Sequence, residues 1–195
     1  LDQTGAKYSL HSYEDISDLV AIDLVNSNAV GWFCGRAEFG PRSLGSRSIL
    51  ADARDPNMQK NLNLKIKYRE SFRPFAPIVL EEKAVEWFDM NFKKSTYMTF
   101  VHKVKKNKLI KKIENNKFSS LEKVNEVRSQ IPAVTHIDNS ARVQTLNYKS
   151  NKKLHNLISK FEKKTNCPVL VNTSFNVRGE PIVSSPVDAF HCFMG

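Results

Sequence analysis

PVLVNTSFNV, residues 168–177, begins with a short apolar run and continues with Asn or Ser at every second position, and this pattern predicts a β-strand. Side chains two residues apart on a strand lie on the same face. We therefore expect Asn172, Ser174, Asn176 and Arg178 on one face, with the opposite face packed on a core. Asparagine is a poor strand former, so its repetition favours a face that contacts a ligand. A face that is simply exposed to solvent is the alternative.

Hydrophobic periodicity on either side of this strand predicts a mixture of helices and strands. The expected helices cover residues 12–28, 55–67, 81–88, 151–164 and the segment that follows a capping box at Ser185. The other expected strands cover residues 29–34, 47–51, 76–80 and two pieces of 131–146 that a turn at 138–140 separates. Because helices and strands do not alternate strictly, we expect an α/β or α+β fold with a mixed sheet.

The domain organisation is expected to be simple. Residues 29–195 should form a single domain, and residues 1–28 a linker and helix from a preceding domain. Residues 93–128 are rich in lysine and asparagine, and we expect a helical insertion there whose lysines point into solvent. The chain does not begin with Met, and a helix is expected to run to its last residues. Both ends are therefore expected to be cuts through a longer polypeptide.

Composition limits the class of protein. The chain of 195 residues is 41% hydrophobic and 26% charged, which is ordinary for a globular protein. No apolar run approaches the roughly 20 residues of a membrane-spanning helix, so no membrane partner is expected. Cys34, Cys167 and Cys192 have neither metal-ligand nor disulfide-framework spacing, which favours a reducing, cytoplasmic location.

A formal net charge of +10 predicts an anionic partner. Arginines are concentrated in and after the glycine-punctuated loop GRAEFGPRSLGSR, residues 35–47. They are Arg36, Arg42, Arg47, Arg54, Arg69 and Arg73. Glycines let backbone N–H groups approach an anion, and each guanidinium offers a charged fork to phosphate or carboxylate oxygens. For a single arginine, the alternative is a structural salt bridge with Glu38, Asp52 or Glu70. No Walker A or GxGxxG pattern occurs, which excludes a standard P-loop or dinucleotide site.

His136 allows two interpretations, because Asp138 follows it in the turn sequence THIDN. The two residues could act as an acid–base pair, or the histidine could order the turn through the carboxylate. The second interpretation is the one we favour, because a histidine titrates usefully only if its neighbours allow it. The remaining histidines have no ligand spacing, and no protein-bound metal is expected.

Four segments in this order resemble a known family. They are GRAEFGPRSLGSRSILAD (35–52), IKYRESFRPFAP (66–77), PAVTHIDNSARVQT (132–145) and NTSFNVRGEPIVSSPVDA (172–189). Together they resemble the C-terminal domain of O-carbamoyltransferases of the NodU/CmcH type. The resemblance covers nearly all of residues 29–193 apart from the lysine-rich insertion. It implies a YrdC-like fold, a twisted mixed β-sheet flanked by helices.

The resemblance also implies a function. YrdC-like domains carry a Lys-x-Arg and Ser-x-Asn signature for nucleotide binding, matched here by Lys67, Arg69, Ser174 and Asn176. ATP, accompanied by Mg²⁺, and carbamoyl phosphate would react to give a carbamoyl adenylate. A separate N-terminal domain of the actin-like ATPase type, with its own metal site, would then pass the carbamoyl group to a hydroxyl acceptor.

Individual roles follow as expectations. Lys67, Arg69, Arg42 and Arg47 are the expected catalytic residues. Among them, Lys67 and Arg69, together with Arg73, would bind the phosphates of the nucleotide or adenylate. Arg42 and Arg47, together with the loop that contains Gly40 and Gly45, would hold carbamoyl phosphate. The other expected binding residues are Arg142, Asn172, Ser174, Asn176 and Arg178.

Two other classes of function compete with this one. The basic composition is compatible with an RNA-binding module, or with a YrdC-like domain that takes part in tRNA modification. Against it, aromatic residues are not interleaved with the lysine run, so nucleic acid is not the expected partner. A regulatory nucleotide-binding domain without catalysis is the second alternative. The acceptor substrate would be bound mostly by the absent N-terminal domain.

Overall fold

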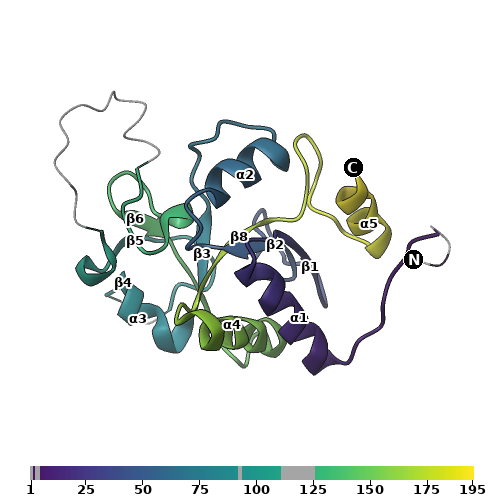
Figure 1. Cartoon of the computed structure of the whole chain (residues 1–195), viewed down its shortest axis with the longest axis horizontal. Coiled ribbons are helices and arrows are strands. Elements are labelled where there is room, and N and C mark those ends of the chain that lie inside the picture. The colour runs from purple at the N-terminus through teal and green to yellow at the C-terminus, as the bar shows by residue number, and fades with distance from the viewer. Residues whose placement is uncertain (1, 3–4, 92–93, 111–125) are drawn as a thin grey trace.

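A five-stranded sheet forms the centre of the protein, in the spatial order β1-β2-β8-β3-β7 (Figure 1). The structure is a computed structural model that describes residues 2, 5–91, 94–110 and 126–195. The strands are β1 (Val30–Phe33), β2 (Arg47–Asp52), β3 (Ala76–Leu80), β7 (Gln144–Leu146) and β8 (Val169–Ser174). Neighbouring strands are antiparallel, except that β3 and β7 are parallel. The sheet is therefore mixed, as the sequence predicts.

β8 lies in the middle of this sheet because its first half is apolar on both faces. Val169, Leu170 and Val171 are fully buried, which is typical of a short apolar run in a central strand. The two strands that flank it, β2 and β3, are also buried along their whole length. The core of the protein is thus built around the strand that carries the Ser-x-Asn signature at its end.

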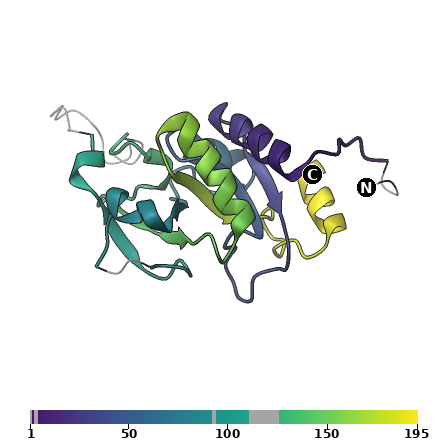
Figure 2. The same ribbon diagram turned by 90° about the horizontal axis from the view of Figure 1, so that it is seen from below.

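Helices cover the sheet. They are α1 (Tyr13–Val25), α2 (Met58–Lys65), α3 (Ala84–Trp87), α4 (Lys152–Thr165) and α5 (Pro186–Met194). α1 and α4 lie side by side across one face, and α2 lies on the other side of the sheet (Figures 1 and 2). α4 buries Leu154, Leu157, Ile158 and Phe161, which form one stripe at helical spacing. Within the described residues, no helix has the length and apolar character needed to cross a membrane.

A second, three-stranded sheet adjoins the first. It is antiparallel in the order β4-β5-β6, formed by β4 (Phe88–Asp89), β5 (Val101–Val104) and β6 (Ser140–Arg142). β6 is followed by β7 after the single buried residue Val143, so the chain passes directly from one sheet to the other. This passage brings Arg142 next to the central sheet.

The segment that we expected to form a helical insertion has a different structure in the part of it that is described. Residues 101–104 form β5, because they pair with β6 on one side and β4 on the other. A short 3₁₀ turn, Lys106–Lys108, follows, and Leu109 forms an isolated bridge with Ser129. Cross-strand pairing has therefore overridden the local helical pattern. Residues 111–125 of the expected helix lie outside the described residues.

Three element boundaries also need correction. α2 begins at Met58 rather than at residue 55, because Asp55 Oδ1 accepts from the backbone N–H of Asn57 and makes a turn before the helix. Residues 132–134 form a 3₁₀ turn rather than a strand, and both short strands follow the turn at 138–140. β8 ends at Ser174, three residues before its expected end. By contrast, the capping box at Ser185 is confirmed at the start of α5.

Gly45 lets the arginine-bearing loop approach α4 closely. Its φ of +113° lies in the region that favours glycine, and an added Cβ would lie 2.4 Å from Leu154 Cδ2. The Asn151 side chain, which also caps the start of α4, donates to the Gly45 carbonyl at 3.4 Å. Leu154 is fully buried and has little room to move. The loop can therefore take this position because Gly45 has no side chain.

We predict that Gly45→Ala lowers the free energy of unfolding by about 1–3 kcal/mol more than Gly40→Ala does, the usual cost of overpacking a core. Gly40 is a matched control, because it lies in the same loop at φ +131° and an added Cβ would meet nothing within 4 Å. Urea denaturation of the two variants measures the difference. Equal losses of stability would show that the contact with Leu154 does not position the loop.

Candidate functional site

Lys67 joins the end of α2 to the end of β8. Its ammonium group donates to Ser174 O at 2.6 Å, to Asn176 O at 2.8 Å and to Asn176 Oδ1 at 2.8 Å. Ser174 Oγ donates to the same Asn176 Oδ1 at 2.6 Å, and Asn176 Nδ2 donates to Glu180 O at 2.8 Å. The two halves of the signature, far apart in the sequence, thus form one hydrogen-bonded cluster.

The charge of Lys67 has no acidic partner within the described part of the chain, since all of its hydrogen-bond acceptors are neutral oxygens. Burial, and to a smaller extent the positive charge of Arg69, lower the pKa of Lys67 from 10.5 to about 8. A buried cation without a counter-ion is costly. An anion bound beside it would supply the missing negative charge.

Arg69 is held in place by a residue that was not among the expected site residues. Asn63, fully buried on α2, accepts from Arg69 Nε at 2.6 Å and donates to Ser71 O and Arg73 O. The Arg69 guanidinium also lies 4.9 Å from the centroid of the Phe75 ring. Burial lowers the pKa of Arg69, and Arg73 adds to the effect. Asn63 therefore fixes both the arginine and the backbone of the segment that carries it.

The first cavity at this site has a volume of about 390 Å³ and is lined by four arginines and a histidine. These are Arg42, Arg69, Arg73, Arg142 and His136. No Asp or Glu lines the cavity within the described part of the chain. Burial and the charge of Arg42 both lower the pKa of Arg142. Unpaired cations that repel one another are typical of a site whose ligand is an anion.

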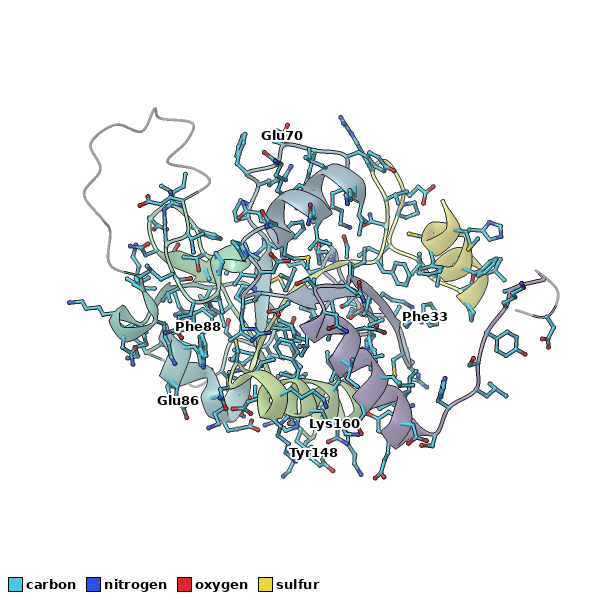
Figure 3. All side chains as sticks on the ribbon, in the orientation of Figure 1. Phe33, Glu70, Glu86, Phe88, Tyr148 and Lys160 are labelled. Carbon is cyan, nitrogen blue, oxygen red and sulfur yellow. The ribbon has the colours of Figure 1, made fainter. Side chains whose placement is uncertain are left out.

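A second cavity of about 320 Å³ adjoins the first, since Arg69, Arg73, Thr173 and Ser174 line both. It adds Lys67, Asn176 and Arg178 to the lining, with Glu70 as its acidic residue. Figure 3 shows Glu70 on the opposite side of the molecule from Tyr148 and Lys160, which lie before and on α4. This acidic residue of the second cavity therefore lies on the side of the molecule away from α4.

Arg178 and the last positions of the signature lie beyond β8. We expected Asn176 and Arg178 to continue one face of the strand, but the strand has ended at Ser174. Arg178 Nη1 instead donates to Tyr68 O at 2.8 Å, and Lys67 gathers Asn176 into the site. Thr173, expected to face the core, lines both cavities. The positions of these side chains follow from where the strand ends, and the alternation of side chains along a strand does not predict them.

Asn172 is buried rather than displayed on an open face, with 2% of its surface exposed. Its amide nitrogen donates to Ser43 O at 3.2 Å and to Gln144 Oε1 at 2.7 Å. Its Oδ1 atom is buried without a hydrogen-bond partner. The hydrogen bond to Ser43 O ties the arginine-bearing loop to the sheet. Asn172 also lines the first cavity, and one of its acceptors is unused.

Arg47 lies outside these two cavities. Its guanidinium donates to Cys34 O at 3.3 Å, Ser46 O at 3.0 Å and Gly35 O at 3.0 Å, and stacks 3.5 Å from the centroid of the Phe33 ring. It lines a smaller cavity of about 140 Å³ that Arg42 also reaches. In this structure Arg47 holds the ends of the loop of residues 35–47 together. Its contact with carbamoyl phosphate stays a prediction.

Structural roles account for two other charged residues of the arginine-rich region. Arg54 forms a salt bridge of 2.6 Å with the buried Asp52, which is the alternative that the sequence allowed for this arginine. Glu38 does not pair with an arginine. Its Oε1 atom accepts from the backbone N–H groups of Leu44 at 2.7 Å and Ser46 at 2.6 Å, which fixes the loop from inside.

Protein carboxylates, thiols and imidazoles do not gather around the site. Within the described residues, no group of three or more His, Cys, Asp or Glu side chains is placed to hold a metal ion. The described residues that line the two cavities offer cations, amides, hydroxyls, one imidazole and the carboxylate of Glu70.

Several known proteins are similar to this chain in sequence. A family model described as carbamoyltransferase C-terminus matches residues 21–195. The protein sll1178 of Synechocystis is 53% identical over 190 residues, which is 97% of this chain and 31% of that protein. The nodulation protein NolO of Bradyrhizobium diazoefficiens is 39% identical over 183 residues, 93% of this chain and 30% of NolO. The chain thus spans about a third of the length of these relatives.

A solved structure has a similar fold. Full-length HypF in its phosphate- and nucleotide-bound form matches with a TM-score of 0.51 at 14% sequence identity. The match covers 96% of this chain and 20% of the HypF chain. At this identity the similarity concerns the fold alone, and it confirms the α/β architecture with a mixed sheet.

We predict that pyrophosphate binding takes up a proton near pH 8 and weakens as the pH rises above about 8, because Lys67 loses its charge there. An anion favours the protonated amine, so its affinity is highest below the lowered pKa and falls as the pH rises through it. Calorimetry in buffers of different ionisation enthalpy measures the proton uptake.

Two variants test whether Lys67 is the group that takes up the proton when pyrophosphate binds. Lys67→Met should lose the uptake, whereas Lys65→Met, an exposed lysine of α2, should retain it. The ionisation of pyrophosphate itself is the same for every variant. Unchanged proton uptake in Lys67→Met would show that another group titrates.

Proposed function

The chain belongs to the carbamoyltransferase C-terminus family, and from this premise we propose that it binds ATP and carbamoyl phosphate and forms a carbamoyl adenylate. One observation carries the proposal: the cluster of Lys67, Ser174 and Asn176 lies beside two adjoining cavities whose lining includes five arginines. The phosphate- and nucleotide-bound state of HypF, whose fold is similar, supports it.

Charge is the first support. ATP and carbamoyl phosphate are both polyanions, and bringing them together in one site is unfavourable unless fixed cations neutralise them. The two cavities offer Lys67 and five arginines, against Glu70 as the acidic residue that lines either of them. Cations that are already oriented stabilise charge on phosphoryl oxygens without reorganising when the reaction occurs.

The geometry supports a division of the site between the two substrates. The second cavity, with Arg69, Arg73 and Arg178, would bind the phosphates of the nucleotide. Lys67 would act there mainly through its charge, because its short hydrogen bonds to Ser174 and Asn176 engage all three of its protons. Magnesium would be held by the phosphate oxygens of ATP.

The first cavity would hold carbamoyl phosphate. Arg42 and Arg142 approach it from a loop and from β6, and Asn172 lies at the end nearest the sheet. The adjoining cavities share Arg69 and Arg73, so the reacting groups of the two substrates would meet between them. Holding two reactants in attack geometry removes much of the entropic barrier. Arg47 would contribute by holding the loop that carries Arg42.

The proposed reaction has two steps, and the atoms balance in each. Water releases phosphate from carbamoyl phosphate and leaves carbamate. A carbamate oxygen then attacks the α-phosphorus of ATP, the new P–O bond forms, and pyrophosphate leaves with the electrons of the broken bond. The arginines would stabilise the negative charge on the carbamate and on the departing pyrophosphate.

Transfer to an acceptor requires more than this chain. Because the relatives are about three times as long, we propose that an N-terminal domain of the actin-like ATPase type passes the carbamoyl group to a hydroxyl. This chain would form the activated intermediate, and the other domain would select the acceptor.

We predict that the chain catalyses exchange of labelled pyrophosphate into ATP, and that the exchange requires carbamoyl phosphate. Arg69→Ala should weaken ATP binding by about 1.5–3 kcal/mol, the range for hydrogen bonds to charged groups. Arg36→Ala is the matched control, because Arg36 is exposed and lines neither cavity of the site. Its ATP affinity should be unchanged.

The outcomes separate the proposed activity from its competitors. If the chain binds ATP but does not exchange pyrophosphate into it, the result would favour a regulatory nucleotide-binding domain. RNA binding with a steep salt dependence, together with no affinity for ATP or carbamoyl phosphate, would contradict the proposal in favour of a nucleic-acid function.

A further inference from the structure

The turn of residues 136–140 borders the first cavity and fixes the imidazole of His136. The backbone N–H of His136 donates to Ser140 O at 2.7 Å, and Asn139 takes a φ of +62° that closes the turn. Lys103 Nζ donates to Asp138 Oδ2 at 2.8 Å. The histidine takes part in this turn through Ser140 rather than directly through the Asp138 carboxylate as expected, and it also lines the cavity.

The hydrogen bonds of the turn determine which ring nitrogen carries the proton. Ser140 Oγ lies 2.5 Å from Asp138 Oδ1 and 3.1 Å from His136 Nδ1. Hydrogen bonds from Lys103 and Ser140 hold the pKa of Asp138 at about 2, so its carboxylate only accepts. The single hydroxyl proton of Ser140 must therefore go to Asp138. Ser140 Oγ then has only lone pairs to offer His136, so Nδ1 must carry a proton.

The remaining ring nitrogen is an acceptor. Burial lowers the pKa of His136 below its usual 6.5, with Asp138 opposing this shift and the positive charges of Arg142 and Lys103 adding to it. The ring is therefore neutral at pH 7, with its one proton on Nδ1. Among the described residues, Nε2 has no hydrogen-bond partner. It is left with a lone pair beside a cavity otherwise rich in donors.

Asn172 provides a second acceptor, as the same assignment of hydrogen-bond donors and acceptors shows. Gln144 Nε2 donates to Leu44 O at 2.7 Å, which orients the Gln144 amide so that its Oε1 accepts. Asn172 Nδ2 must therefore point at Gln144 Oε1 and Ser43 O, and both of its protons are engaged. The opposite atom, Oδ1, is buried with no partner. A buried acceptor without a donor costs free energy, unless a ligand supplies the donor.

His136 and Asn172 both line a cavity of cations, and each has an acceptor atom without a partner among the described residues. The ligand should therefore carry both anionic oxygens and N–H donors. We infer that His136 Nε2 and Asn172 Oδ1 accept the two N–H protons of the carbamoyl amide and thereby select carbamoyl phosphate over acetyl phosphate. The inference rests on the proposed function and adds His136 to the site as a specificity residue. Acetyl phosphate has the same charge and nearly the same shape, but a methyl group replaces the NH₂ group.

The size of the discrimination follows from the unpaired acceptors. Acetyl phosphate would leave both acceptors without a donor, whereas carbamoyl phosphate would satisfy them. We expect the chain to bind carbamoyl phosphate at least about 10-fold more tightly than acetyl phosphate. His136→Leu should lower this ratio about 10-fold by weakening carbamoyl phosphate alone, because leucine keeps the bulk but removes the acceptor.

Calorimetry of the chain with each acyl phosphate measures the ratio. His155→Leu is the matched control, since His155 pairs with Glu82 and lines neither cavity. Ser140→Ala retains the imidazole but removes the group that fixes its tautomer, and it should lower the ratio less than His136→Leu does. Long-range ¹H–¹⁵N correlation spectra of the chain without ligand should show the His136 proton on Nδ1, a readout that does not depend on binding.

The outcomes distinguish the inference from the function on which it rests. A proton on Nε2 of His136, equal affinities for the two acyl phosphates, or an unchanged ratio in His136→Leu would each overturn the inference and leave the proposed function intact. Binding of neither acyl phosphate would overturn both.

Discussion

The buried ammonium group of Lys67 is the interaction on which the rest of the site depends. It holds the end of α2 to the end of β8 through Ser174 and Asn176. Together with the hydrogen bond from Arg178 to Tyr68 O, this link fixes the segment that carries Arg69 against the end of the central strand. Because the oxygens around Lys67 are neutral, its positive charge is not cancelled by the protein. The same group therefore shapes the site and gives it an affinity for anions.

Among the described residues, salt bridges of arginine involve Arg54 and Arg128, and none of the arginines that line the two cavities. Asn63 positions Arg69, and the loop that bears Arg42 is held by Glu38, Asn172 and the guanidinium of Arg47. Glu38 accepts only from backbone N–H groups, so it fixes the loop without neutralising an arginine. Mutual repulsion among the arginines is the cost of this arrangement, and a polyanionic ligand would relieve it.

Much of the fold and of the site could be predicted from the sequence. β8 could be recognised because its apolar run is continuous, and α4 because its apolar stripe has helical spacing. Arg42 could be expected at the site because it lies in the glycine-punctuated loop, and Arg142 because it lies in a segment that resembles the family. The orientation of Arg47 could not, because it depends on backbone carbonyls that the folded loop brings together. Asn63 and the unused acceptor of Asn172 depend likewise on contacts between distant segments.

The most direct test of the account is a crystal structure of the chain with α,β-methylene ATP, an analogue that cannot lose pyrophosphate. The account predicts that the phosphates lie in the second cavity, within hydrogen-bond distance of Arg69 and Arg73, while Lys67 retains its bonds to Asn176. Nucleotide bound elsewhere, for example in the apolar groove lined by Phe33, Phe175 and Phe193, would contradict it.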